Sequence, residues 1–186
     1  MLKFLKQKYV IAVLLVLFLG GAAIISYGFV PVMKVEGKFV TLAQFLKVYS
    51  AIRRFDGISQ KTPSTDADLK KRAFMNIIET RFLDIVVEKT GVGLRQEAGN
   101  LAEKAVAERK SEFEEASQRL YGLSAAEFEK LVLLPQAEKE VLEKHYENNQ
   151  ADLEKNWAEI YKTSEVKIYY PGFEWKDGEV KIKNKK

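Results

Sequence analysis

The sequence contains no cysteine and a single histidine, His145, among 186 residues. Without cysteine, no disulfide can brace the fold and no lipid-modified N-terminal cysteine can anchor the chain. Metal sites built from Cys and His are excluded as well, and no acidic loop has calcium-binding spacing. A Ser-His-Asp triad would need His145, whose neighbours Glu143 and Lys144 are typical of an exposed helix surface. These absences favour a protein that is not an enzyme and that holds no metal or cofactor.

Positive charge is slight, with 30 Lys and Arg residues against 26 Asp and Glu residues. Three of the lysines, Lys3, Lys6 and Lys8, precede the first apolar run, and without them the two signs nearly balance. Lys and Glu are interspersed along helical patterns and form no basic stripe, which disfavours nucleic-acid binding. The one dense basic run is in residues 181–186. It is typical of a solvated terminus, and contact with anionic lipid or a cell-wall polymer is the alternative.

One long uncharged run, Tyr9–Val32, follows the leading lysines. As a helix of 24 residues it would reach about 36 Å, enough to cross a hydrocarbon core of about 30 Å. No acidic residue occurs before Glu36. The positive-inside rule therefore predicts a single-pass protein with residues 1–8 in the cytoplasm and the rest outside it.

A cleaved signal peptide is the alternative for this run. Val10–Leu19 would be its apolar region, with cleavage after small residues at Gly20 and Ala22 or at Gly21 and Ala23. Apolar sequence continues beyond these sites to Val32, which favours an uncleaved anchor. The protein is exported in both cases, either membrane-bound or secreted.

Helical periodicity dominates the first half of the remaining chain. Thr41 and Gln44 form a capping-box pattern that opens the first helix. The polar, Gly- and Pro-containing segment Asp56–Ser64 is predicted to be a loop. A second helix is expected from about Thr65 to Thr90, with Gly91 as its C-terminal stop.

The second half is predicted to be helical as well. A charge-rich helix is expected from Arg95 to Tyr121, followed by a second capping box at Ser124 and Glu127. Pro135 should kink or break the helix that this box opens, because proline lacks an N–H and clashes with the preceding turn. A last helix should run from about Ala151 to Lys162.

Strand patterns occur only near the two ends of the domain. Met33–Val40 reads as two short apolar stretches around a turn at Glu36 and Gly37, and Val166–Glu174 begins with strict alternation. Asp177-Gly178 is a hairpin turn signal. Because isolated strands this short are unstable, the two segments are expected to pair with each other.

The predicted fold class is therefore mainly α. An N-terminal transmembrane helix, residues 9–32, precedes a helical domain, residues 33–175, with a small β element formed by the N- and C-terminal segments. Residues 176–186 form a hairpin end and the basic tail.

Aromatic residues are the remaining candidates for a functional site. Most of them should form the core, but thin apolar stripes and a kinked helix predict an open apolar groove that could hold extended polypeptide. The groove-lining residues predicted from helix faces are Phe45, Tyr49, Phe82, Tyr121 and Phe128.

Several segments resemble the N-terminal module of the SurA and PrsA type of extracytoplasmic foldases, which include membrane-anchored relatives of the PpiD type. The matching segments are Val35–Phe45, Arg72–Val92, Phe113 with Leu120–Ser124 and Phe128, Val141–Asn148, and Glu165–Ile168. The resemblance implies a SurA N-terminal-like helical domain that binds unfolded or newly exported polypeptides. The parvulin-type prolyl isomerase domain of that family has no counterpart here, so isomerase activity is not implied.

A structural or scaffold role in a cell-envelope complex is the alternative function. The long helices would then form a homodimer or dock on a fixed partner, and the apolar surface would be buried in a defined oligomer.

Overall fold

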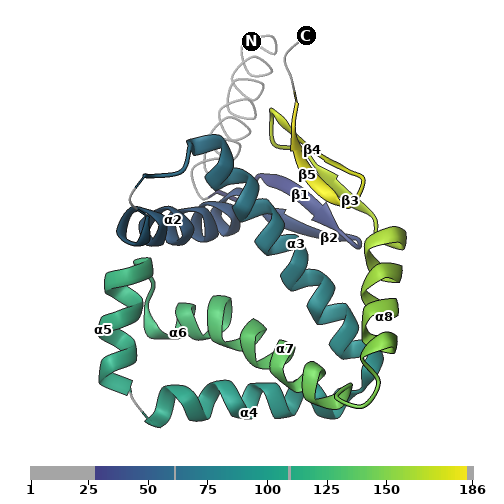
Figure 1. Ribbon diagram of the computed structural model, residues 1–186. Helices are drawn as coiled ribbons and strands as arrows, with labels where there is room; N and C mark the ends of the chain where they lie inside the picture. Colours follow the sequence, from purple (N-terminus) through teal and green to yellow (C-terminus); the bar gives the residue numbers. More distant parts are fainter. Residues whose placement is uncertain (1–27, 61, 109, 184–186) are drawn as a thin grey trace, which may run out of the picture.

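A computed structural model describes residues 28–60, 62–108 and 110–183 of the chain (Figure 1). The α-helices are α2 (Leu42–Ser59), α3 (Asp66–Thr90), α4 (Val92–Glu108), α5 (Lys110–Tyr121), α6 (Ala125–Phe128), α7 (Leu134–His145) and α8 (Gln150–Thr163), with a π-helical segment η1 (Glu129–Leu133) between α6 and α7. The strands are β1 (Pro31–Val35), β2 (Lys38–Thr41), β3 (Val166–Ile168), β4 (Phe173–Lys176) and β5 (Glu179–Ile182). The prediction of a mainly helical domain with a small β element is confirmed.

The C-terminal end of the predicted membrane span belongs to the folded domain. Residues 28–30 are not helical, and Val32 lies in β1 with only 5% of its surface exposed. The prediction that the span continues to Val32 is wrong, because this side chain packs into the core. Residues 9–27 lie outside the described residues. Within the part of the chain that the structure describes, no helix is long and apolar enough to cross a bilayer.

Both predicted capping boxes are confirmed. The Thr41 N–H donates to Gln44 Oε1 at 2.9 Å, and the Gln44 N–H donates to Thr41 Oγ1 at 3.3 Å. The same reciprocal pair joins Ser124 and Glu127 at the start of α6. These bonds satisfy backbone donors that a helix N-terminus leaves unpaired, which is why the two sites are readable from sequence.

The predicted loop Asp56–Ser64 is too long. Helix α2 continues to Ser59, and Asp56 is buried within its last turn with 2% exposure. Its carboxylate accepts hydrogen bonds from the backbone N–H and hydroxyl of Ser64, both at 2.8 Å, and from Arg72 at 2.7 Å. These hydrogen bonds, that from the Ser64 N–H foremost, lower the pKa of Asp56. The side chain thus secures the helix end instead of beginning a loop.

The predicted helix from Arg95 to Tyr121 is two helices. Helix α4 packs along α7, whereas α5 turns away from it and packs against α2. Figure 1 shows α4 and α5 running in clearly different directions. The chain bends because the two halves follow different partners, which is information that a local pattern does not contain.

Pro135 does not break its helix. Because proline has no N–H, it cannot donate to the carbonyl of Leu131 as a helical residue would. The structure accommodates this with the wider π-helical turns of η1, which directly precede the proline. Segments α6, η1 and α7 therefore form one continuous curved helix.

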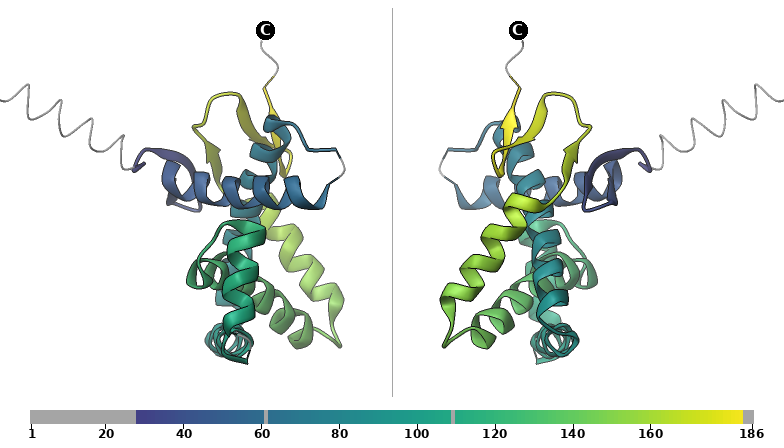
Figure 2. Two further views of the ribbon diagram at one scale, coloured as in Figure 1. Left: turned by 90° about the vertical axis from the view of Figure 1, so that its left-hand side faces the viewer. Right: turned by 90° about the vertical axis from the view of Figure 1, so that its right-hand side faces the viewer.

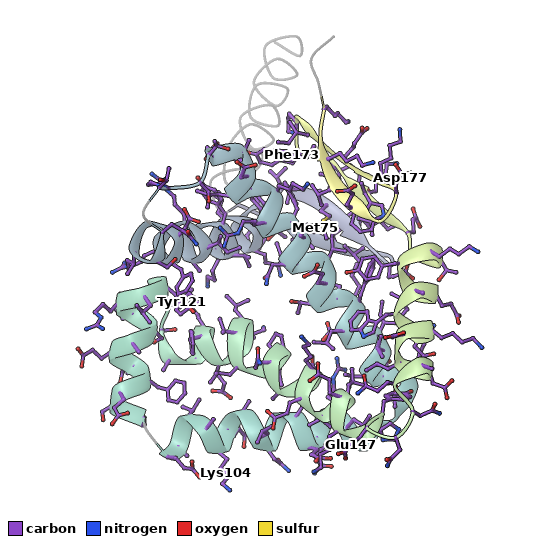
Figure 3. The ribbon with its side chains drawn as sticks, viewed as in Figure 1. Met75, Lys104, Tyr121, Glu147, Phe173 and Asp177 are labelled. Carbon is purple, nitrogen blue, oxygen red and sulfur yellow. The ribbon has the colours of Figure 1, made fainter. Side chains whose placement is uncertain are left out.

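The two ends of the domain pair as predicted. Strand order is β2-β1-β3, all antiparallel, with Met33 opposite both Val40 and Ile168. The Asp-Gly hairpin is confirmed as well, with φ angles of 56° at Asp177 and 78° at Gly178 between β4 and β5. This hairpin is part of the core: Val180 is fully buried and its N–H lies 3.4 Å from the Met75 sulfur (Figure 3).

Two unequal cores result. We call the five strands with α2, α3 and α8 the frame, whose core contains the fully buried rings of Phe45, Phe74 and Phe82. We call α4, α5, α6, η1 and α7 the arm. Its buried cluster consists of small side chains: Ala98, Ala102, Ala137 and Val141. Figure 2 shows the arm extending below the sheet and α2.

Candidate functional site

A groove separates α2 and α3 of the frame from η1 and α7 of the arm. It consists of two cavities. The larger, here the Trp157 cavity, measures about 540 Å³, and the smaller, here the Lys47 cavity, measures about 390 Å³. The two cavities adjoin, because five residues line both: Val48, Asn76, Thr80, Leu131 and Pro135. Each volume is within the range of about 300–1,000 Å³ that is usual for ligand pockets.

The Trp157 cavity has an apolar and aromatic wall. Trp157 and Tyr161 come from α8, Leu131 and Val132 from η1, and Tyr121 from the end of α5. Trp157 and Tyr161 are four residues apart and so share one helix face, with ring centroids 6.3 Å apart. Rings and aliphatic side chains in a partly open cavity favour binding of apolar side chains.

The groove is kept open by its end contacts. At the α5 end, the rings of Phe55 and Tyr121 stack with centroids 5.1 Å apart, and Arg54 Nε donates to the Arg119 carbonyl at 3.0 Å. Figure 3 shows Tyr121 at the end of α5 that faces α2. At the opposite end, α7 packs directly on α3. The arm therefore packs on the frame at both ends of the groove and spans the space between them.

Polar groups without protein partners lie at the centre of the groove. Asn76 and Thr80 are one helical turn apart on α3 and line both cavities. Within the described chain, neither side chain makes a hydrogen bond. Gln136 on α7, in the wall of the Trp157 cavity, is likewise without one among these residues. Amide and hydroxyl groups of this kind can pair with the N–H and C=O groups of a bound peptide backbone.

Charged groups surround the Lys47 cavity. Lys47 of α2 forms an ion pair with Glu127 of α6, bridging frame and arm, and this bond is the main cause that lowers the pKa of Glu127 to about 2. On the other side, Glu138 of α7 is 2% exposed and lies 3.9 Å from Arg95 Nε. Burial, together with the nearby charge of Asp84, raises the pKa of Glu138 to about 7.

The structure brings only part of the predicted site together. Tyr121 lines the Trp157 cavity, and Phe128 packs against it from behind, with ring centroids 5.1 Å apart. Tyr49 lies outside both cavities and donates a hydrogen bond to Asp66 at 2.5 Å. Phe45 and Phe82 have 0% exposure, so the prediction that they line the groove is wrong.

Both errors have a physical cause. Phe45 is covered by Phe74 and Tyr170, with centroids at 4.3 and 5.4 Å. Phe82 is covered by Tyr161 and Trp175, with centroids at 5.1 and 6.1 Å. Three of the four covering rings come from the C-terminal third of the chain, whose position over α2 and α3 is set by tertiary packing.

Sequence reasoning also missed groove residues. Trp157, Tyr161, Asn76, Thr80 and Leu131 were not singled out as a site. The i,i+4 aromatic pair of α8 was the available signal, since two large rings on one face of a charged helix need a partner.

The single histidine of the chain does not line this groove. His145 is exposed at the end of α7, with its ring 4.9 Å from that of Tyr146. Among the residues that the structure describes, no three His, Asp or Glu side chains are arranged to hold a metal ion. No protein-family model, curated protein or solved structure matches this chain. The resemblance to extracytoplasmic foldases therefore stays a prediction.

Proposed function

We propose that this protein binds unfolded or newly exported polypeptide segments in the groove between frame and arm, as a chaperone-like holding protein and not as an enzyme. One observation carries the proposal: two adjoining cavities combine an aromatic wall with amide and hydroxyl groups that have no protein partner within the described chain. An extended segment presents apolar side chains and unpaired backbone groups together, and this groove offers a partner for each.

The charge pattern of the groove supports a tolerant binding mode. The paired charges at Lys47 and Glu127, and at Arg81 and Asp84, neutralise each other within the wall. The groove thus offers no dominant charge that would select one sign of ligand. Apolar contact without strong charge selection suits clients of varied sequence.

The location proposed for this activity is the outer surface of the cell membrane. Val40 and Ala43 line the Lys47 cavity, and the Ala43 N–H donates to the Gly28 carbonyl at 3.0 Å. Gly28 lies in the uncharged run Tyr9–Val32 that is predicted to span the membrane, directly after residues 9–27. One mouth of the groove would then lie close to the point where the chain leaves the bilayer, where exported polypeptides emerge.

A matched pair of substitutions tests the groove. Leu131→Ser removes an apolar side chain shared by both cavities, whereas Leu46→Ser removes one that is 45% exposed on α2 outside them. The full chain in lipid nanodiscs is titrated with a fluorescently labelled, reduced and carboxymethylated protein as a permanently unfolded client. Leu131→Ser should weaken binding about ten-fold or more, because burial of a leucine side chain contributes about 1.5–3 kcal/mol.

Leu46→Ser should bind like the unsubstituted protein, and circular dichroism should show that both variants keep their helices. Equal binding by the two variants would contradict the groove assignment. A defined oligomer that shields the groove and excludes the client would instead support the scaffold alternative.

A further inference from the structure

A second surface stands out on the three-stranded sheet. Phe39 of β2 lies opposite Lys34 of β1, and Lys34 lies opposite Lys167 of β3. Paired residues in antiparallel strands point to the same side of a sheet, so these three side chains form one row. The neighbouring row, Met33, Val40 and Ile168, points to the opposite side and into the core. The Phe39 row is therefore on the outer face.

Aromatic rings on this face are unusually exposed. Phe39 is 58% exposed, and Tyr169, two residues beyond Lys167 on the same face, is 42% exposed. The two ring centroids are 6.4 Å apart. Lys34 Nζ lies 6.0 Å from the centroid of the Phe39 ring, and Lys167 Nζ lies 5.8 Å from that of Tyr169. The face thus combines a pair of rings with an ammonium group beside each.

The position of the face relative to the chain start is its second distinguishing feature. The Tyr169 N–H donates to the Val32 carbonyl at 2.8 Å, and Leu42 N–H donates to the Val30 carbonyl at 2.7 Å. The first described residues therefore lie along the Tyr169 end of the sheet. Phe29, next to Gly28, is 64% exposed. Figure 2 shows the β1–β2 hairpin at the side of the molecule where the described chain begins.

The acidic residues near the sheet lie at the end of the sheet opposite Tyr169. Glu36 is in the β1–β2 turn, where its carboxylate accepts a hydrogen bond from the Glu165 backbone N–H. The outward row itself carries only the two lysines and the rings. Charge is thus arranged with the basic and aromatic groups toward the chain start.

We infer that the outer face of the β2-β1-β3 sheet is a lipid-contact surface, on which Phe39 and Tyr169 enter the bilayer interface and Lys34 and Lys167 bind anionic lipid headgroups. Aromatic rings favour the headgroup level of a bilayer, and lysines near the surface are attracted to anionic lipid. The bilayer is the proposed partner of this face, because the membrane span predicted in the sequence before Gly28 would bring the face within reach of that bilayer. The inference rests on that predicted span and not on polypeptide binding in the groove.

Such a contact would fix the orientation of the domain. A single flexible attachment leaves a domain free to tilt, whereas a second contact on the sheet restricts it. The Lys47 cavity, with Val40 of the inward-pointing row in its wall, would then be held in a fixed orientation relative to the membrane.

The absence of cysteine gives a direct test with single-cysteine variants of the full chain. Tyr169→Cys places a bimane label, itself an aromatic ring, beside Phe39 on the outer face of the sheet. Lys104→Cys places it on α4, far from the sheet (Figure 3), and Leu15→Cys places it in the predicted span. Each protein is put into nanodiscs with or without anionic lipid, and quenching by headgroup nitroxide lipid is measured.

We expect strong quenching at position 169 that increases with anionic lipid, and little quenching at position 104. Adding Phe39→Ser with Lys34→Gln and Lys167→Gln should reduce quenching at position 169 to the level of position 104. Adding Leu46→Ser instead should leave it unchanged. Circular dichroism of each variant checks that the sheet substitutions leave the fold intact.

Equal quenching at positions 169 and 104, with the label at position 15 quenched, would overturn the inference while leaving the anchor in place. Failure of the label at position 15 to reach lipid would overturn both. Self-quenching between two labelled chains at position 169 would assign the face to a dimer and also overturn the inference. Client titration on the same samples reports separately on the groove, so loss of groove binding would leave this inference standing.

Discussion

The frame and the arm differ in how their cores are packed. In the frame, large rings are fully buried and the C-terminal hairpin packs on α3. In the arm, α4 and α7 approach through alanines, which lets two helices lie close but buries little apolar surface. The groove lies where the two kinds of packing meet. The well-packed frame thus fixes the position of one wall of the groove, and the thinly packed arm leaves room for a ligand.

The largest expected effect comes from opening the frame core. Phe74→Ala should lower the free energy of unfolding by about 3–5 kcal/mol, because Phe74 has 0% exposure and its removal leaves a cavity. Urea denaturation followed by circular dichroism measures this. Phe39→Ala, at a 58% exposed position, should cost less than about 0.5 kcal/mol. Similar costs for the two would mean that the frame is not the stable half.

Overfilling the arm should have an intermediate effect. Ala98→Leu inserts a larger side chain where Ala98 has 0% exposure between α4 and α7, and should cost about 1–3 kcal/mol. Ala107→Leu, on an exposed position of the same helix, is the matched control and should be nearly neutral. Stabilisation by Ala98→Leu would show that the arm core has unfilled space.

Glu138 gives the contact between arm and frame a pH dependence. Its pKa is raised from 4.5 to about 7, so the folded protein holds this proton more tightly than the unfolded chain does. The stability that the protonated Glu138 contributes is therefore fully present below pH 4.5 and is lost as pH rises through 7. Glu138→Gln lacks this titration. Between pH 4 and pH 8, the free energy of unfolding of this variant should rise by about 1–2 kcal/mol relative to that of the unsubstituted protein. Urea denaturation at the two pH values measures the gain, and a pH-independent difference would contradict it.

The smallest effect is expected from the ion pair that bridges the two halves. Lys47→Gln should lower the free energy of unfolding by less than about 1 kcal/mol, because both partners are solvent-exposed. The difference should shrink in high salt. Lys139→Gln, which removes an exposed pair within α7, is the control. A large, salt-resistant loss at Lys47 would mean that this bridge, and not packing at the two ends, holds the arm to the frame.

What could be predicted from sequence follows from how local each feature is. The capping boxes at Thr41 and Ser124 and the turn at Asp177 involve atoms a few residues apart, so their patterns are sufficient. The pairing of β1 with β3 could be predicted because isolated short strands must find a partner. Pro135 was expected to kink or break its helix. The structure shows no break, because a π-helical segment accommodates the proline, and this segment has no comparable sequence signal.

The candidate site could be predicted only in outline. An open groove beside a proline-containing helix was expected, and Tyr121 lies in its wall. Phe45 and Phe82 look equally suited by helix face, but rings from distant segments cover them. Trp157 reaches the groove only because α8 returns beside α3, and no local pattern encodes that return.

The two tryptophans of the chain give the most direct test of the central claim, since Trp157 lines the groove and Trp175 does not. With Trp175→Phe, the fluorescence of Trp157 should change saturably as an unfolded, tryptophan-free polypeptide is added. With Trp157→Phe, the fluorescence of Trp175 should change little over the same range. Binding of the client without any response of Trp157, or with an equal response of Trp175, would contradict the groove as the binding site.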